Sequence, residues 1–132
     1  MRARSAAARI TVLLCENSAW KASAELPADS ALRGVDFVKI PCSGRVDAGL
    51  LLSLLEHGSA GVLAVGCPKD DCTFLRGNYR AEKRVSATRA ILREAGLDEG
   101  LVRLSFVSAM DAHRLRESVL DFKRYLDDNS SS

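Results

Sequence analysis

The chain has 132 residues, of which 47% are hydrophobic and 27% are charged, and its net charge at pH 7 is +2. This length suits one domain with its own core, and the composition is typical of an ordinary folded domain. The small net charge and the aromatic content of 5% argue against nucleic acid or a membrane surface as the binding partner.

The N-terminal segment bears on the location of the protein. Residues 1–9 are basic, and Arg9 interrupts the apolar stretch that a secretory signal would need. No stretch approaches the ~20 apolar residues of a membrane-spanning helix. We therefore predict a cytoplasmic protein without a membrane span. Residues 1–9 are expected to be a flexible segment, residues 10–126 one folded domain, and residues 127–132 a flexible tail.

The first half of the chain alternates two strand-like runs with two helix-like runs. Residues 10–14 are apolar and rich in β-branched side chains, as expected for a strand covered on both faces. The Ala-rich residues 17–25 are compatible with a helix, and residues 35–40 form a second strand that a proline ends. Residues 47–57 are predicted to form a helix, with Asp47 as its N-cap and a glycine just beyond its end.

The second half repeats this alternation. Residues 61–65 are a third buried strand, and residues 78–95 are a long amphipathic helix closed by a glycine. Residues 101–107 are a fourth strand, expected near an edge of the sheet, and residues 111–126 are the last helix. The apolar stripes of the two helices are predicted to be Val85, Ile91, Leu92 and Ala95 in the first and Leu115, Val119, Phe122 and Leu126 in the second.

This alternation predicts a single-domain α/β fold. Strands separated by helices of this length form a parallel sheet with helices on both faces, of the flavodoxin-like or Rossmann-like type. The sheet is expected to have four to five strands, and right-handed crossovers give the strand order 2-1-3-4. A dinucleotide-binding oxidoreductase is disfavoured, because no G-x-G-x-x-G motif follows the first strand.

The four cysteines of the chain all follow predicted strands. Cys15 comes directly after the first strand, Cys42 comes two residues after the second, and Cys67 and Cys72 come after the third. Because the carboxyl ends of parallel strands meet at one edge of the sheet, these thiols are candidates for a single site. In a reducing compartment, cysteines in such numbers indicate metal binding or redox chemistry more than structural disulfides.

Thiolates that meet at one site can bind tetrahedral zinc or an iron–sulfur cluster, or they can form a redox-active disulfide. Cys67 and Cys72 match part of the plant-type [2Fe–2S] spacing, although Leu75 stands where the next cysteine of that pattern would be. Arg45 and Lys69 lie in the same loops, and positive charge stabilises thiolates. Any single cysteine could instead be a small buried apolar residue, so the spacing leaves these alternatives open.

A basic segment and an aromatic residue are further candidates. The basic residues at and before the start of the third predicted helix are Arg76, Arg80, Lys83 and Arg84. They form either a solvated helix face or a docking surface for an acidic partner or a flavin phosphate. Trp20 either shields the site from water or belongs to the core.

Three motifs together resemble a known family. The motifs are CSGRVD at residues 42–47, GVLAVGCPKDDC at residues 61–72 and GNYRAEKR at residues 77–84. In this order they are similar to the delta subunit of methyl-viologen-reducing hydrogenase, and the resemblance spans residues 10–126. It implies a [2Fe–2S] protein that relays electrons between a catalytic subunit and a heterodisulfide-reductase-like flavoprotein.

The resemblance also implies the ligands and the partners. The cysteines that match those of the family, and hence the implied ligands of the [2Fe–2S] cluster, are Cys15, Cys42, Cys67 and Cys72. Family members often have a further cysteine close behind the first and a histidine where Pro68 stands here. The implied partners are a heterodisulfide-reductase-like flavoprotein subunit and a hydrogenase, formate dehydrogenase or other reductase subunit, joined in a hetero-oligomer.

Two other classes of function use the same cysteines. A thiol-based redox sensor or a zinc-binding module would differ from the electron carrier in its metal content. A thiol enzyme similar to arsenate reductases or low-molecular-weight phosphatases needs an anion-binding loop that ends in arginine, whereas Lys21 stands six residues after Cys15. We therefore predict a non-catalytic electron-transfer subunit of an oxidoreductase complex.

Overall fold

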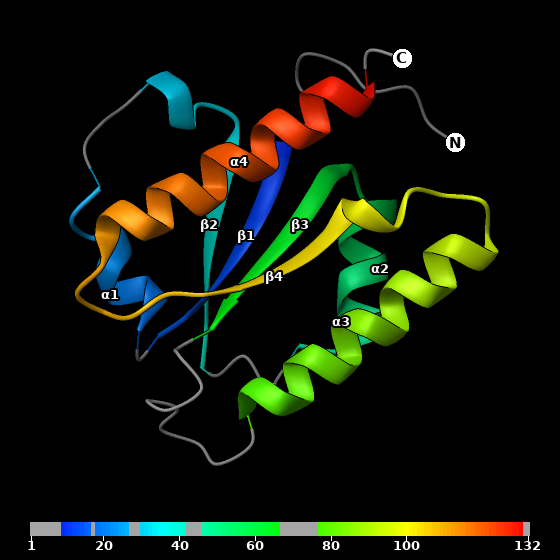
Figure 1. Cartoon of the computed structure of the whole chain (residues 1–132), viewed down its shortest axis with the longest axis horizontal. Helices are drawn as coiled ribbons and strands as arrows, with labels where there is room; N and C mark the ends of the chain where they lie inside the picture. The colour runs from blue at the N-terminus through cyan, green and yellow to red at the C-terminus, as the bar shows by residue number, and fades with distance from the viewer. Residues whose placement is uncertain (1–8, 17, 27–29, 42–45, 67–76, 131–132) are drawn as a thin grey trace.

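The computed structural model of the chain is an α/β domain with one parallel sheet (Figure 1). It describes residues 9–130 apart from residue 17 and residues 27–29, 42–45 and 67–76. The strands lie in the order β2-β1-β3-β4. Their bounds are Arg9–Cys15 for β1, Val35–Ile40 for β2, Ser59–Gly66 for β3 and Val102–Phe106 for β4. The predicted fold class and strand order are confirmed.

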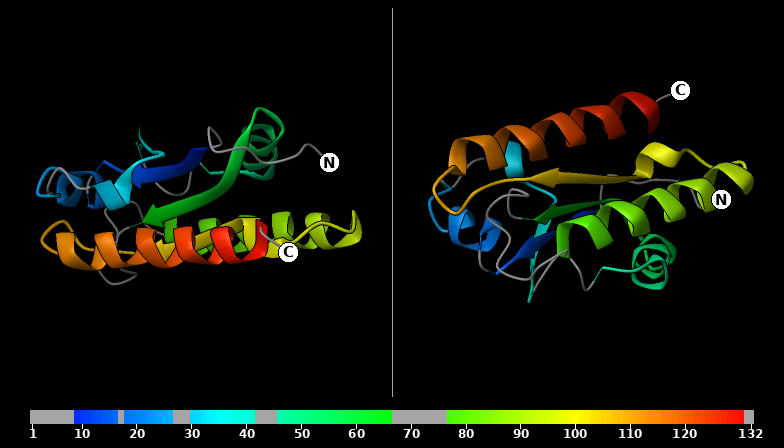
Figure 2. Two further views of the ribbon diagram at one scale, coloured as in Figure 1. Left: turned by 90° about the horizontal axis from the view of Figure 1, so that it is seen from above. Right: turned by 60° about the horizontal axis from the view of Figure 1, so that its bottom comes forward.

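Helices cover both faces of the sheet (Figures 1 and 2). On one face α1 packs against α4, and on the other α2 packs against α3, as right-handed crossovers require. The helix bounds are Ala19–Ser23 for α1, Ala48–Glu56 for α2, Gly77–Glu94 for α3 and Ala112–Ser130 for α4. Single 3₁₀ turns at Ser30–Leu32 and Glu99–Leu101 precede β2 and β4. None of the helices in the described ranges is long and apolar enough to cross a membrane.

The two central strands carry most of the core. Val12 and Leu14 of β1, and Val62 and Val65 of β3, have no exposed surface. Helices on both faces bury both sides of these strands, which explains why they read as continuous apolar runs. β4 lies at an edge of the sheet, as its alternating sequence predicted.

The ends of α2 follow the signals read from the sequence. Asp47 is its N-cap, and the carboxylate Oδ1 accepts a hydrogen bond from the Leu50 amide at 2.8 Å. Gly58 follows the C-cap with a φ of 112°, a left-handed conformation that glycine adopts without strain. The sequence therefore predicted both the position of this helix and the residues that end it.

The buried stripe of α3 differs from the predicted one. Ile91 is 44% exposed, and Ala95 lies beyond the helix end and is also exposed, so both assignments were wrong. The observed stripe has helical spacing and consists of Ala81, Val85, Thr88 and Leu92. Thr88 can be buried because its hydroxyl donates a hydrogen bond to the Arg84 carbonyl oxygen at 2.8 Å. A prediction that counts only apolar residues overlooks this position.

The buried stripe of α4 agrees with the prediction, but the helix is longer. Its four predicted members, Leu115, Val119, Phe122 and Leu126, are all buried. α4 continues to Ser130, into the segment that was expected to be a tail. The prediction ended the helix at its last apolar residue. An existing helix can add a further turn without burying apolar side chains, because its nucleus has already formed.

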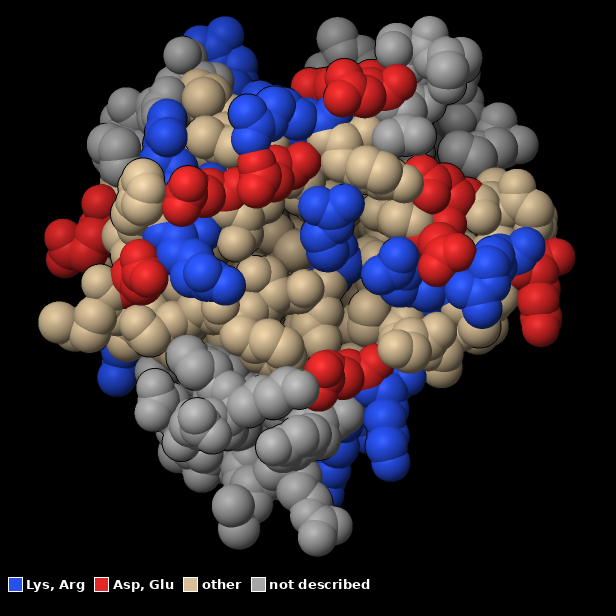
Figure 3. Space-filling view, in the orientation of Figure 1, with Lys and Arg blue, Asp and Glu red and all other residues tan. Residues whose placement is uncertain are grey.

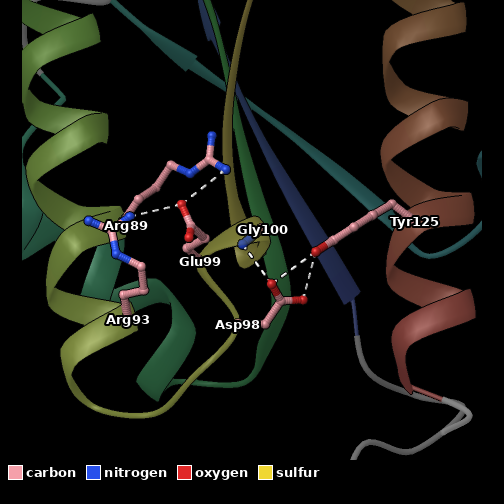
Figure 4. Close-up of polar contacts among 6 residues, drawn as sticks. All are labelled: Arg89, Arg93, Asp98, Glu99, Gly100 and Tyr125. Atoms are coloured by element: carbon pink, nitrogen blue, oxygen red, sulfur yellow. Dashed lines mark hydrogen bonds and ion pairs between the residues drawn. The ribbon is translucent and has the colours of Figure 1, made fainter.

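Polar contacts at the start of β4 join the two helical layers (Figure 4). The Tyr125 hydroxyl donates to the Asp98 carboxylate, whose oxygens lie at 2.9 Å, and the Gly100 amide donates to the same carboxylate at 2.8 Å. Glu99 forms ion pairs with Arg89 and Arg93 of α3, at 3.5 and 3.0 Å. Residues 98–100 thus form hydrogen bonds with α4 on one side of the sheet and ion pairs with α3 on the other.

We predict that Tyr125→Phe lowers the free energy of unfolding at pH 7 by about 1–2 kcal/mol, because the Asp98 carboxylate loses a donor. The hydrogen bond to Asp98 and burial raise the pKa of Tyr125 above its ordinary value of 10.0. The stabilisation is therefore complete below about pH 10 and is lost as the pH rises through the raised pKa. Urea unfolding of the unaltered chain and of the Tyr125→Phe variant, at pH 7 and at rising alkaline pH, tests this prediction. Equal stabilities at pH 7 would contradict it.

Candidate functional site

The carboxyl edge of the sheet holds the one cysteine that lies within the described residues. Cys15 is the last residue of β1, is 1% exposed, and is paired with Ile40, the last residue of β2. Two further hydrogen bonds tie the strand ends together. The Glu16 amide donates to the Ile40 carbonyl oxygen at 2.8 Å, and the Val107 amide donates to that of Gly66 at 2.8 Å. Cys15 therefore lies at an edge where hydrogen bonds join the ends of neighbouring strands.

The other three predicted ligands, Cys42, Cys67 and Cys72, lie outside the described residues. The chain on either side of them is described. Residues 42–45 connect the end of β2 to α2, and residues 67–76 connect the end of β3 to α3. Both segments therefore start from the edge at which Cys15 lies.

The strand register assigns the Cys15 side chain to one face of the sheet. Ile10 of β1 is paired with Gly61 of β3, and a Cβ on Gly61 would lie 2.6 Å from Leu126 Cδ1 of α4. Ile10 and Leu14 therefore point toward α4. Because side chains alternate along a strand, Cys15 points to the opposite face, which α2 and α3 cover.

Arg103 of β4 is an independent check of these faces. It is paired with Leu63, which lies two residues after Gly61 and therefore faces α4. Its guanidinium lies 5.2 Å from the ring centroid of Phe122 and 4.9 Å from that of Tyr125, both in α4. The assignment of side chains to the two faces of the sheet therefore holds from β1 to β4. Cys15 thus faces α2 and α3, the two helices that follow the segments with the other three cysteines.

Arg84 of α3 contacts the residue before the N-cap of α2. Its guanidinium donates a hydrogen bond to the Val46 carbonyl oxygen at 3.0 Å, and the Val46 side chain is fully buried. Val46 is thus held by α3 and by its own burial. The sequence assigned Arg84 to a solvated or docking surface, but this hydrogen bond gives it a structural role.

The remaining members of the basic segment are placed differently. Arg80 and Lys83 are exposed, and Arg76 lies outside the described residues. Figure 3 shows Lys and Arg side chains beside the first turns of α3. Along the rest of α3 and along α4, positive and negative side chains are mixed on this face. On this face of the described residues, Lys and Arg side chains therefore stand beside the first turns of α3.

Trp20 matches neither of its predicted roles closely. It is 36% exposed on α1, and the Lys39 ammonium lies 5.6 Å from its ring centroid. Such a cation–π contact stabilises an exposed aromatic side chain by about 0.5–1 kcal/mol. Trp20 is therefore not a core residue, and α1 lies on the face opposite to the Cys15 side chain.

Ser18 is a residue that the sequence analysis missed. It is buried, its hydroxyl makes no hydrogen bond, and its amide donates to the Cys15 carbonyl oxygen at 3.2 Å. A serine near the start of a helix is normally expected to be its N-cap. Nothing in the sequence pattern indicates that this hydroxyl is buried, because its burial results from tertiary packing.

The donor set determines which group this edge could hold. Within the described ranges, no cluster of three or more His, Cys, Asp or Glu side chains is placed to hold a metal ion. Cys15 is a buried soft donor, and the other three thiols of the chain follow strands that end beside it. Four thiolates suit an iron–sulfur cluster or zinc, so the residues present fit either group.

Comparison with known proteins identifies relatives of the chain. The family described as "Methyl-viologen-reducing hydrogenase, delta subunit" matches residues 10–128. A ferredoxin/F(420)H(2)-dependent CoB-CoM heterodisulfide reductase subunit of Methanosarcina acetivorans is 30% identical over 122 residues, which are 90% of this chain and 15% of that protein. An F420-non-reducing hydrogenase iron-sulfur subunit of Archaeoglobus profundus is 34% identical over 88 residues, which are 67% of this chain and 64% of that protein.

A third relative gives the same picture. The vhu iron-sulfur subunit of the F420-non-reducing hydrogenase of Methanopyrus kandleri is 33% identical over 85 residues, which are 64% of each chain. The chain thus spans less than two thirds of the length of the curated relatives it matches, and only 15% of the Methanosarcina acetivorans protein.

Proposed function

Because the chain belongs to the family of the methyl-viologen-reducing hydrogenase delta subunit, we propose that it is a [2Fe–2S] electron-transfer subunit. In this proposal it relays electrons between a catalytic redox subunit and a heterodisulfide-reductase-like flavin subunit in a cytoplasmic complex. The cluster ligands are Cys15, Cys42, Cys67 and Cys72. When bound, the cluster supplies one-electron redox chemistry, and the protein supplies ligation, burial and docking.

The position of Cys15 carries the proposal. Its side chain is buried on the face that α2 and α3 cover, and the segments that contain the other cysteines lead into those same helices. Cys67 is bonded to Gly66, and Cys42 follows Ile40 by two residues, so these thiols follow strand ends adjacent to Cys15. This arrangement supports one site made by all four thiols.

The surrounding backbone suits a negatively charged group. α2 begins at Ala48 and α3 begins at Gly77, each directly after a segment that starts from this edge. Helix N-termini carry a partial positive charge, which favours thiolates and an anionic cluster. The burial of Cys15 keeps water from its sulfur, and the hydrogen bond from Arg84 holds Val46 against α3 just before α2 begins. These residues would position the cluster without taking part in substrate chemistry.

The names of the relatives support the two ends of the relay. The Archaeoglobus profundus relative is an iron-sulfur subunit of a hydrogenase. In the Methanosarcina acetivorans relative, the similar stretch is part of the polypeptide of a heterodisulfide reductase subunit. We propose that this chain associates with a subunit of that kind in a hetero-oligomer. The electron donor can be a hydrogenase, a formate dehydrogenase or another reductase subunit.

Electron transfer to the flavin subunit tests the relay. The chain would be purified without oxygen, reduced with dithionite, freed of excess reductant and mixed with the oxidised flavin subunit. We expect the visible absorption of the oxidised cluster to return while the flavin bleaches. A loaded cluster that stays reduced in the presence of its flavin partner would contradict the relay role.

We predict that Arg80→Glu weakens binding to an acidic partner. Arg80 is exposed in the first turn of α3. Reversing its charge should lower the affinity about fivefold, or ~1 kcal/mol, at low salt, and less at high salt. Glutamate in a first helical turn is favourable, so the fold should not suffer. Calorimetric titration of the partner at two salt concentrations measures the effect.

Arg33→Glu is the matched control for this variant. Arg33 is also exposed, but it precedes β2 and so lies at the opposite edge of the sheet. Arg33→Glu changes the net charge by the same amount as Arg80→Glu. If the start of α3 is the docking surface, Arg33→Glu should leave the affinity for the partner unchanged. Equal losses in the two variants would show a general charge effect and would contradict a local one.

A further inference from the structure

The outer edge of β4 has no strand beside it in the described part of the chain. β4 pairs with β3 on its inner side and lies between α4 and α3 in Figure 1. The open side of an edge strand presents a row of backbone N–H and C=O groups, which is a template for a further strand. The side chains of β4 indicate what kind of strand that would be.

The side chains of β4 differ in kind between the two faces of the sheet. Arg103 lies against α4, as described above, and the Ser105 hydroxyl oxygen lies 3.2 Å from that of Ser118 in α4. Because side chains alternate along a strand, the remaining residues face α3. They are all apolar: Val102, Leu104 and Phe106. β4 is therefore polar on the α4 face and apolar on the α3 face.

We propose that β4 pairs antiparallel with β4 of a second copy of this chain, so that two four-stranded sheets join into one. A twofold axis at Leu104 places this residue opposite Leu104 of the second copy, and Val102 opposite Phe106. On the other face, Arg103 lies opposite Ser105 of the second copy, and this pair occurs twice. The guanidinium is a hydrogen-bond donor and the hydroxyl an acceptor, so every opposed pair is of matching kind.

Other registers of two β4 strands fit less well. Directly opposed side chains of an antiparallel pair lie on the same face, so the twofold axis must coincide with a residue. An axis at Arg103 would place two guanidinium groups opposite each other. An axis at Ser105 would leave Arg103 beyond the end of the second strand, because β4 ends at Phe106. The register centred on Leu104 is therefore the one that the sequence of β4 favours.

The other edge strand, β2, is not self-complementary in this way. It carries Asp36 and Lys39 on opposite faces of the sheet. A twofold axis at Phe37 or at Val38 places each charged side chain opposite an apolar one. Asp36 is also ion-paired within the chain, with Arg9 at 2.8 Å. Charged side chains on an edge strand oppose further pairing, so we assign the interface between copies to β4.

Two substitutions at Ser105 test this interface by their opposite signs. Sedimentation equilibrium of the full chain, kept reduced, would be measured up to ~1 mM, so that even weak association is detected. The unaltered chain should approach twice the mass of one copy. Ser105→Glu places a carboxylate opposite Arg103 of the second copy and should lower the dimer dissociation constant about fivefold. Ser105→Lys places an ammonium there and should raise it about fivefold.

The two Ser105 variants are matched, because both lose the contact with Ser118 and both add a long charged side chain. Val38→Lys is the control at the other edge. Val38 is 41% exposed on β2, and this change adds the same charge as Ser105→Lys without touching β4. It should leave the dissociation constant unchanged. Circular dichroism confirms that each variant is folded, and Ser105→Glu alone decides the question if Ser105→Lys does not fold.

The outcomes are distinct from those that test the proposed function, because the β4 interface uses none of the cysteines. A chain that stays monomeric at every concentration overturns the proposal. So do Ser105 variants that shift the dissociation constant in the same direction, since loss of the hydroxyl would then explain both. A dimer that Val38→Lys dissociates would lie at β2, which also overturns it. Opposite shifts at Ser105 with no shift at Val38 support it.

Discussion

Cys15→Ser is expected to lower the iron and sulfide contents of the purified chain by more than about tenfold, since even changes behind the ligands cost 10–100-fold in metal affinity. Serine is close to cysteine in size, but its hydroxyl is not deprotonated at neutral pH and is a harder donor than thiolate. Cys15 is buried on the face of the sheet that α2 and α3 cover. Water therefore cannot easily take the place of the missing thiolate as a ligand. Iron and sulfide analysis of chains purified without oxygen measures the loss.

Ala64→Ser is the matched control for this variant. Ala64 is fully buried on β3 and is paired with Leu13, two residues before Cys15, so it lies on the same face of the sheet. This change buries a hydroxyl near the site without removing a thiol. We expect a similar loss of stability, about 1–3 kcal/mol, with the cluster retained. Full iron content in Cys15→Ser would contradict the assigned ligand set.

Gly61→Ala is expected to lower the free energy of unfolding by about 1–3 kcal/mol through overpacking. A Cβ at this position of β3 would lie 2.6 Å from Leu126 Cδ1 and 2.8 Å from Phe122 Cζ. Both side chains are buried in the stripe by which α4 packs on the sheet, so neither can move without displacing its neighbours. Urea unfolding followed by circular dichroism measures the difference.

Gly49→Ala is the comparison that isolates packing from the general effect of replacing glycine. Gly49 is exposed in α2, and a Cβ there would meet Asp47 Oδ1 at 3.4 Å, an ordinary contact. Alanine favours a helix over glycine by about 0.8–1.0 kcal/mol, so this variant should be more stable than the unaltered chain. If both variants shift stability in the same direction, the close packing of α4 on Gly61 is refuted.

The fold could be predicted from the sequence because local signals agree with the tertiary arrangement. Residues 35–40 are a strand with the predicted bounds, and Asp47 caps α2 as its position indicated. The prediction was wrong where burial depends on a polar residue that bonds within its own helix. Thr88 takes the place in the buried stripe that Ile91 was expected to fill, and a pattern of apolar residues cannot reveal that.

The site was predictable in outline only. The rule that strand ends of a parallel sheet meet at one edge correctly placed Cys15 beside the ends of β2 and β3. The positions of Cys42, Cys67 and Cys72 stay predictions, since they lie outside the described residues. One supporting residue could not be found from the sequence. Arg84 looked like a surface charge, and only the packed structure shows its hydrogen bond to Val46.

Metal and sulfide analysis tests the central claim most directly. The chain would be purified without oxygen, alone and with its native partners, and an EPR spectrum would be recorded after dithionite reduction. One [2Fe–2S] cluster predicts about two irons and two sulfides per chain and a signal of the reduced cluster. Zinc in place of iron, or no metal even in the intact complex, would contradict the claim and would favour a zinc-binding module or a thiol-based redox sensor.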